Sequence, residues 1–202
     1  MIKIPDSEKI HPLMEYFDNL QQPHHSILLY EKTEFARLVK SKYIKNSLKK
    51  REHTICITHE NIKYLEQELF STGLDVDYFK RKNLLHIYQI DNIMKHKDGL
   101  RKGLQELLKM ITAESKPPYN FMGCIIPDVS TKEGMDAELE IEHLFHSNFK
   151  SYSSSFLCTY NIEDIAQDQR QSVLENLLAN HHHVIYAVEP EEAVAFETDL
   201  LV

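Results

Sequence analysis

Seven polar residues stand where short apolar runs end, and this is where chemistry is expected in a parallel sheet. They are Tyr30, Glu31, His59, Glu60, Asp128, Tyr160 and Asn161. Ligands of open parallel sheets bind beyond the carboxyl ends of the strands, so these side chains are predicted to share one rim. Tyrosine offers an aromatic surface with a polar tip, and carboxylates offer acceptors for a ligand or an ion. We therefore predict a small-molecule binding site formed by these seven residues.

The first predicted loop matches a phosphate-binding loop only in part. Lys32 and Thr33 stand at the start of a predicted helix after a buried strand, as the Lys-Ser/Thr pair of such loops does. Residues 24–36 contain no glycine, and glycines allow backbone N–H groups to wrap a phosphate. Asp128 follows an apolar run, like a metal-holding aspartate of ATPases, but it stands alone. The pattern disfavours ATP hydrolysis.

Nothing in the chain indicates nucleophilic catalysis. The sequence has no G-x-S-x-G elbow. Cys56, Cys124 and Cys158 form no close pair, and each has apolar neighbours, which is typical of buried strand residues in a reducing compartment. We expect free thiols within the sheet, with a reactive or metal-bound thiol as the alternative, and we expect no catalytic residue.

Two groups of side chains have metal-binding residue types. Glu138, Glu142 and His146 recur at four-residue spacing on one helical face. The last two, with Asp128 nearby in sequence, could hold a divalent ion, although acidic helical faces are more often solvated. The histidines at 181–183 lead into a strand, where consecutive side chains alternate in direction and do not readily share one metal. We therefore predict a solvated acidic face, a solvated histidine loop, and neither a metal nor a cofactor.

The elements that position these residues alternate between buried strands and amphipathic helices. The apolar runs are 26–30, 54–58, 84–90, 121–126, 155–160 and 183–188, and helical spacing follows the first five. Buried strands joined by helices indicate a parallel sheet that is covered on both faces. The predicted fold is a single three-layer α/β/α domain with a mainly parallel sheet of about six strands.

The last segment, 189–202, begins with an acidic stretch that suits a helix N-terminus. It then carries the apolar side chains Phe196, Leu200, Leu201 and Val202. Apolar side chains of this size favour burial, so we expect the tail to dock on its own sheet. The alternative is that it packs against another copy or a partner.

Composition and charge exclude several classes of protein. The chain has 202 residues, 42% of them hydrophobic, and no apolar run of the length that a membrane-spanning helix needs, which is about twenty residues. Residues 1–9 contain no apolar signal core, so we expect a soluble cytoplasmic protein without a membrane partner. Residues 111–202 have 4 basic against 16 acidic side chains, which argues against direct nucleic-acid binding. A basic cluster is predicted to be a solvated helical face: Lys40, Lys42, Lys45, Lys49, Lys50 and Arg51.

Several stretches together resemble the MEDS family, the sensory domain named for methanogens, methylotrophs and the repressor of dichloromethane dehalogenase. They are His25–Glu31, Glu52–Thr58, Leu157–Asn161 and Leu177–Val184. The recurrent opening of the family falls on His25, Leu29 and Tyr30, and its later C-x-Y falls on Cys158 and Tyr160. The resemblance covers about residues 24–190. The family is similar in outline to the RecA/KaiC ATPases, and on that comparison Glu60 and Asp128 match the glutamate after the second strand and the strand-end aspartate.

The resemblance implies a RecA-like core, with a degenerate phosphate loop, that serves as a small-molecule sensor. The division it suggests is a short helical extension at 1–23, the sensory domain at 24–190 and the apolar tail at 191–202. We expect a non-catalytic signalling module that binds a small molecule, such as a one-carbon or hydrocarbon derivative, and acts on a protein signalling partner or a second copy of itself. The alternatives are an atypical nucleotide-binding or nucleotide-hydrolysing enzyme of the RecA/KaiC type and an interaction scaffold without a ligand.

Overall fold

The computed structural model describes residues 13–20, 23–189 and 192–198. The first half of the chain contains α1 (Leu13–Asn19), β1 (His25–Tyr30), α2 (Thr33–Lys49), β2 (His53–Thr58), α3 (Ile62–Ser71), α4 (Val76–Arg81), β3 (Leu85–Gln89) and the 3₁₀ helix η2 (Ile93–Lys95). The second half contains α5 (Leu100–Ile111), β4 (Tyr119–Gly123), α6 (Lys132–Tyr152), β5 (Ser154–Asn161), the 3₁₀ helix η3 (Ile162–Asp164), α7 (Arg170–Ala179), β6 (His183–Glu189) and β7 (Glu192–Glu197). Within the described residues, every helix is too short or too polar to cross a membrane.

Side-chain caps fix the starts of several helices. Asn61 accepts a hydrogen bond from the backbone N–H of Lys63 at the start of α3, and Thr131 accepts one from Gly134 at the start of α6. Such caps satisfy N–H groups that have no partner inside the helix. These short polar residues thus decide where the chain leaves a loop and begins to cover the sheet.

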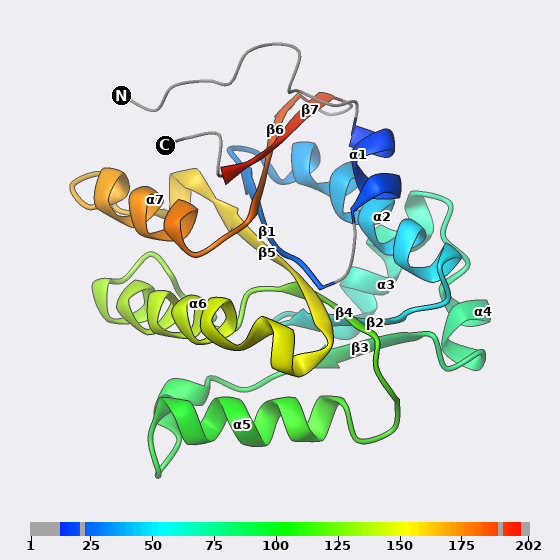
Figure 1. Cartoon of the computed structure of the whole chain (residues 1–202), viewed down its shortest axis with the longest axis horizontal. Coiled ribbons are helices and arrows are strands. Elements are labelled where there is room, and N and C mark those ends of the chain that lie inside the picture. Colours follow the sequence, from blue (N-terminus) through cyan, green and yellow to red (C-terminus); the bar gives the residue numbers. More distant parts are fainter. Residues whose placement is uncertain (1–12, 21–22, 190–191, 199–202) are drawn as a thin grey trace.

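In the described residues the strands form one seven-stranded sheet, in the order β3-β2-β4-β5-β1-β6-β7 (Figure 1). Every neighbouring pair is parallel except β6 and β7, which are antiparallel. Parallel neighbours need crossover connections, and here helices make them. The predicted three-layer α/β/α fold with a mainly parallel sheet is confirmed.

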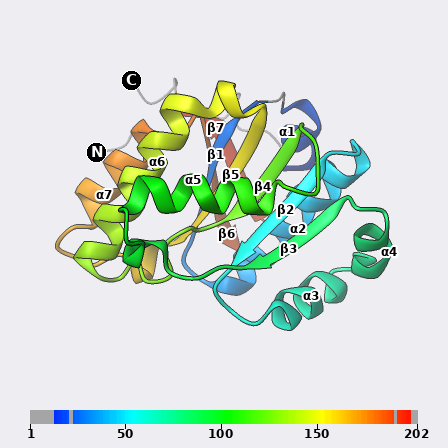
Figure 2. The ribbon, with the colours of Figure 1, turned by 90° about the horizontal axis from the view of Figure 1, so that it is seen from below.

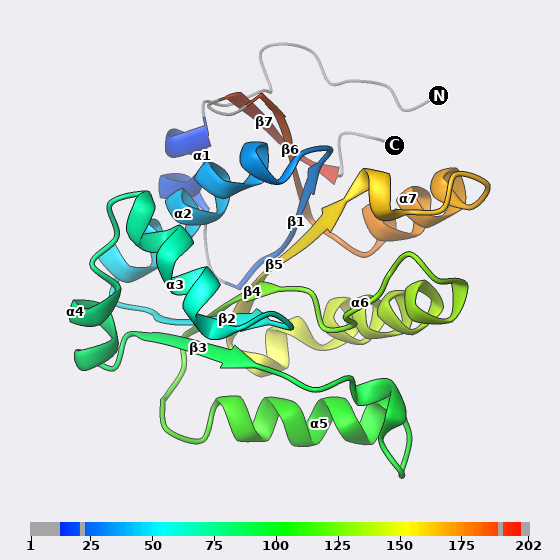
Figure 3. The ribbon, with the colours of Figure 1, turned by 180° about the vertical axis from the view of Figure 1, so that it is seen from behind.

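Helices cover both faces of the sheet, as the two further views show (Figures 2 and 3). One hydrophobic core lies between the sheet and α5, α6 and α7, and the other lies between the sheet and α1, α2, α3 and α4. The centrally placed β1 contributes to both cores, because successive side chains of a strand point to opposite faces. Ile27 and Leu29 face α6, whereas Leu28 packs with α2. This alternation puts His25 on the α6 side and Tyr30 on the α2 side.

The fourth strand is shorter than the sequence predicts. The apolar run 121–126 was expected to be one strand, but β4 ends at Gly123. Gly123 has a φ of 143°, and a Cβ there would lie 2.6 Å from the backbone oxygen of Ile57. Only glycine fits so close to the neighbouring strand, and the chain turns at this point. Cys124 therefore lies in the loop after β4, and the prediction that it is a strand residue is wrong.

The C-terminal segment forms a strand where the sequence suggested a helix. Glu192–Glu197 pairs with β6, with Ala195 opposite Ile185 and Phe196 opposite Val184. Ala195 is fully buried. Pairing supplies partners for the backbone groups on the outer edge of β6, which a helix could not do. Leu200, Leu201 and Val202 lie outside the described residues.

Candidate functional site

The carboxyl ends of the parallel strands meet at one edge, where Tyr30 has a charged neighbour that the sequence analysis placed elsewhere. The ammonium of Lys40, on α2, lies 5.2 Å from the centre of the Tyr30 ring. Lys40 is half-buried, and burial lowers the pKa of its ammonium. The prediction that Lys40 belongs to a solvated basic face is wrong. The missed signal is its position one turn from Ala36 and from Ile44, both of which are buried.

Acidic side chains act electrostatically on this pair. Burial raises the pKa of Tyr30 to about 12, and the charges of Asp164, Glu68 and Glu60 act in the same direction. The carboxylates of Glu68 and Glu60 also favour the charged form of Lys40, against the effect of its burial. The surroundings of Tyr30 thus combine an aromatic ring, a cation and the charges of carboxylates from the segments after β2 and β5.

The other predicted rim residues bond to the protein itself. Both ring nitrogens of His59 face backbone oxygens, those of Ile90 at 3.3 Å and Cys124 at 3.2 Å, so His59 joins the loops after β3 and β4. Two further contacts are local: Asp128 accepts from the Ser130 hydroxyl, and Asn161 accepts from the N–H of Glu163. A third joins distant parts of the chain, because Glu31 accepts from the Tyr186 hydroxyl. Of the seven predicted residues, Tyr30 lies against Lys40 and Glu60 acts on both electrostatically, while the Tyr160 hydroxyl bonds to Glu138 and Glu142 on α6.

The loop between β1 and α2 is only two residues long, Glu31 and Lys32. The Lys32 ammonium lies 5.3 Å from the centre of the Phe35 ring, and the side chain of Lys32 makes no capping hydrogen bond. A phosphate cradle requires a longer loop of successive N–H groups that point inward. The loop at this position therefore differs from a glycine-rich phosphate-binding loop.

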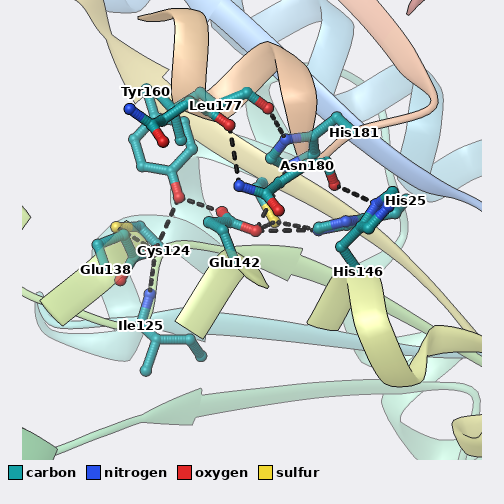
Figure 4. Close-up of polar contacts among 12 residues, drawn as sticks. His25, Cys124, Ile125, Glu138, Glu142, His146, Tyr160, Leu177, Asn180 and His181 are labelled. Carbon is teal, nitrogen blue, oxygen red and sulfur yellow. Dashed lines mark hydrogen bonds and ion pairs between the residues drawn. The ribbon is translucent and has the colours of Figure 1, made fainter. Parts of the chain in front are cut away.

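Two buried glutamates form a second polar group, on the α6 side of the sheet (Figure 4). Glu138 and Glu142 lie one turn apart on α6 and are 1% and 0% exposed. The hydroxyl of Tyr160 lies 2.9 Å from Oε1 of Glu138 and also bonds to Oε1 of Glu142. The prediction that this helical face is solvated is therefore wrong.

The loop after β4 holds the first of these glutamates. Glu138 accepts hydrogen bonds from the N–H groups of Ile125 and Ile126, at 3.3 and 2.8 Å, and from the thiol of Cys124 at 3.3 Å. Burial raises the pKa of Glu138 to about 7, and the neighbouring charge of Glu142 adds to this increase. The carboxyl group of Glu138 is therefore largely protonated below neutral pH.

Two histidines hold the second glutamate. His25 Nε2 lies 2.9 Å from Glu142 Oε2, and His181 Nε2 lies 3.4 Å from the same oxygen. Burial raises the pKa of Glu142, but His181 and His25 outweigh it and hold that pKa well below its usual range. The Cys158 thiol lies 3.3 Å from Glu142 Oε2. The prediction of a solvated histidine loop is wrong for His181, which is 2% exposed.

His146 and Asp128, which the spacing suggested as partners of Glu142, lie outside this group. His146 Nδ1 instead bonds to the carbonyl of Asn180 at 2.8 Å, and Asp128 is exposed. The buried group thus consists of His25, Glu138, Glu142, Cys158, Tyr160 and His181, with Cys124 at one end.

Comparison with protein families identifies the chain. The model of the MEDS family, described as the methanogen/methylotroph, DcmR sensory domain, matches residues 24–182. The chain belongs to the MEDS family. The matched range includes His25 and Tyr30 near its start and His181 near its end, so both polar groups of this MEDS domain lie within the family region. A sensory or regulatory role follows from the family.

Among solved structures, this MEDS domain is similar to the KaiC-like protein of the hyperthermophilic archaeon Pyrococcus horikoshii OT3. The two share 13% sequence identity with a TM-score of 0.58, over 92% of this chain and 81% of that one. At this identity the likeness shows the fold, which is RecA-like, and nothing of the chemistry. No curated protein matches the sequence.

Proposed function

We propose that this MEDS domain is a non-catalytic sensory module that binds a small, partly apolar molecule at the carboxyl rim of its sheet. The observation that carries the proposal is the half-buried Lys40 ammonium, which lies 5.2 Å from the centre of the Tyr30 ring and whose charged form is favoured by the charges of Glu68 and Glu60. A cation kept partly out of water is costly unless a partner compensates for its lost hydration. A ligand with an acceptor group and a short apolar part would contact the ammonium and the ring together.

Several features support binding without catalysis. The two-residue loop after β1 differs from a glycine-rich phosphate-binding loop, and Asp128 is engaged by Ser130. Burial raises the pKa of the Cys56 thiol to about 12 and that of Cys158 well above its usual value, so neither provides a thiolate nucleophile. One-carbon and hydrocarbon derivatives are the ligand class we propose, with a signalling protein or a second copy of the chain as the receiver of the signal.

A thermal-shift panel tests the proposal. The panel contains methanol, methylamine, formate, dichloromethane and adenine nucleotides, each titrated to saturation. We expect one of the small compounds to raise the melting temperature, and Lys40→Met to abolish the shift. Lys49→Met, an exposed lysine on the same helix, is the matched control and keeps the shift.

Two results would contradict the proposal. The first is a ligand-induced shift that is identical in Lys40→Met and in the wild type, because the rim would then not be the binding site. The second is ATP turnover that is lost in Glu60→Gln and Asp128→Asn, because the enzyme alternative would then hold.

A further inference from the structure

Four buried side chains from four separate segments bring metal-ligating atoms to one point. They are His25 at the start of β1, Cys158 in β5, Glu142 in α6 and His181 in the loop before β6, and their donor atoms all lie within 4.8 Å of one another. Each of these four residues is at most 5% exposed. Figure 4 shows the imidazoles of His25 and His181 directed at the Glu142 carboxylate.

The separations between the donor atoms fit tetrahedral coordination. Glu142 Oε2 lies 2.9 Å from His25 Nε2, 3.3 Å from Cys158 Sγ and 3.4 Å from His181 Nε2, and His25 Nε2 lies 3.4 Å from Cys158 Sγ. With zinc bonds of about 2.0–2.3 Å, the edges of a ligand tetrahedron are about 3.3–3.8 Å long. These four separations differ from the edges of such a tetrahedron by at most a few tenths of an ångström, and the two remaining separations are within 4.8 Å.

The hydrogen bond of His181 fixes which of its nitrogens faces the cluster as an acceptor. Nδ1 lies 2.6 Å from the carbonyl oxygen of Leu177, so Nδ1 carries the hydrogen. In the neutral ring, Nε2 then directs a lone pair at the Glu142 carboxylate, and Nε2 is buried without a hydrogen-bond partner. A cation must lie between two acceptors that face each other in a dry interior, and either a proton on Nε2 or a metal ion meets this need. An N–H donated to a backbone carbonyl is also the usual support of a metal-bound histidine.

The charges of the four residues also suit a divalent ion. Binding of a metal ion would displace the proton of the Cys158 thiol, and the resulting thiolate together with the Glu142 carboxylate balances a charge of +2. The Tyr160 hydroxyl donates to the other oxygen of Glu142 and fixes the orientation of that carboxylate. The set of two nitrogens, one sulfur and one oxygen favours zinc among divalent ions.

We propose that His25, Glu142, Cys158 and His181 form a tetrahedral site for one zinc ion or a similar divalent transition-metal ion. Four protein ligands and complete burial describe a structural site, since no position is left for a substrate. The ion would tie β1 and β5 to α6 and to the loop that carries His181. The proposal is independent of the rim site, because no residue is shared between the two.

Zinc analysis of the full-length chain is the first test. Buried ligands exchange slowly, so the protein is unfolded with a chelator and then refolded with one equivalent of Zn²⁺ or without metal. We expect one zinc per chain after gel filtration, and a higher melting temperature than that of the metal-free protein. A refolded protein that retains well under one equivalent of zinc and melts at the same temperature contradicts the proposal.

Cobalt reports the identity of the ligands. Refolding with Co²⁺ should give intense visible bands typical of tetrahedral cobalt and a near-ultraviolet charge-transfer band from a thiolate. Cys158→Ser should lose the charge-transfer band, whereas Cys124→Ser, whose thiol instead bonds to Glu138, should keep it. A band that survives in Cys158→Ser overturns the assignment.

A measurement on the wild type covers the case in which Cys158→Ser does not fold. X-ray absorption of the zinc-loaded protein should show three nitrogen or oxygen scatterers at about 2.0–2.1 Å and one sulfur at about 2.3 Å. Six oxygen scatterers, or no sulfur, would place the ion elsewhere and contradict the proposal.

Discussion

The hydroxyl of Tyr160 lies between the carboxylates of Glu138 and Glu142, one turn apart on α6, with a single proton for two acceptors. Because both carboxylates are buried, they cannot both be ionised without a large electrostatic cost. The pKa of Glu138 is raised to about 7, whereas Glu142 is held ionised by His181 and His25. Besides the hydroxyl proton of Tyr160, the proton that the two carboxylates share is therefore bound by Glu138.

The first prediction concerns pH. Glu138 has a higher pKa in the folded chain than in the unfolded chain, so the folded state binds more protons between about pH 4.5 and pH 7. The contribution of Glu138 to stability must fall as pH rises through this window, by on the order of 1 kcal/mol per pH unit at most, while the lowered pKa values of His24 and His25 act in the opposite direction. We expect Glu138→Gln to remove this contribution, so that the stability of the variant rises more steeply with pH than that of the wild type in urea unfolding measured at several pH values. Glu140→Gln, an exposed neighbour, should leave it unchanged, and equal slopes for Glu138→Gln and the wild type would count against the assignment.

The second prediction concerns the hydroxyl itself. Tyr160→Phe removes the donor shared by the two carboxylates and leaves both with one partner fewer. We expect a loss of about 1–3 kcal/mol in the free energy of unfolding, as for other buried groups deprived of a partner. Tyr64→Phe is the matched control because Tyr64 is 66% exposed, and it should change stability by less than about 0.5 kcal/mol. Similar losses for the two variants would show that the Tyr160 hydroxyl contributes nothing specific.

The third prediction separates backbone strain from steric contact. Gly123→Ala puts a Cβ 2.6 Å from the Ile57 backbone oxygen at a φ of 143°, whereas Gly99→Ala has a φ of 90° with no atom within 4 Å. Strain alone costs roughly 1–3 kcal/mol. We expect Gly123→Ala to lose clearly more stability than Gly99→Ala in chemical unfolding. The extra loss reflects displacement of the loop that holds Glu138, and equal losses for the two would argue against a close approach.

The positions of Tyr30 at the end of β1 and of Glu60 after β2 were predictable, because apolar runs locate strand ends and parallel strand ends share an edge. Their role in a binding site stays a prediction. The burial of Glu138 and Glu142 could not be predicted in this way, because glutamates at four-residue spacing normally indicate a solvated helical face. Its signal was nevertheless present: Glu138 and Glu142 lie on the same stripe of α6 as Met135 and Phe145, and both of these apolar residues are buried.

Other features depend on contacts that no local pattern encodes. His181 lies in a polar run next to two more histidines, and only the crossover from α7 to β6 places it against Glu142. Strand order, which brings β1 beside β5 and thus His25 near Cys158, is likewise a property of the whole sheet. The strand β7 was missed because the acidic residues that precede its apolar side chains also suit a helix start.

The last prediction concerns β7 and the oligomeric state. Deleting residues 192–202 removes the strand paired with β6, including the buried Ala195 and the partly buried Phe196. The loss of apolar burial is expected to cost about 2 kcal/mol or more, measured as the free energy of unfolding. It also exposes the edge of β6, and an unpaired edge promotes association, so we expect the truncated chain to self-associate at high concentration in light scattering. Deleting only residues 199–202 keeps β7 and is the control. If the longer deletion instead converts an oligomer into a folded monomer of unchanged stability, the segment serves as an interface between copies and its pairing with β6 contributes little.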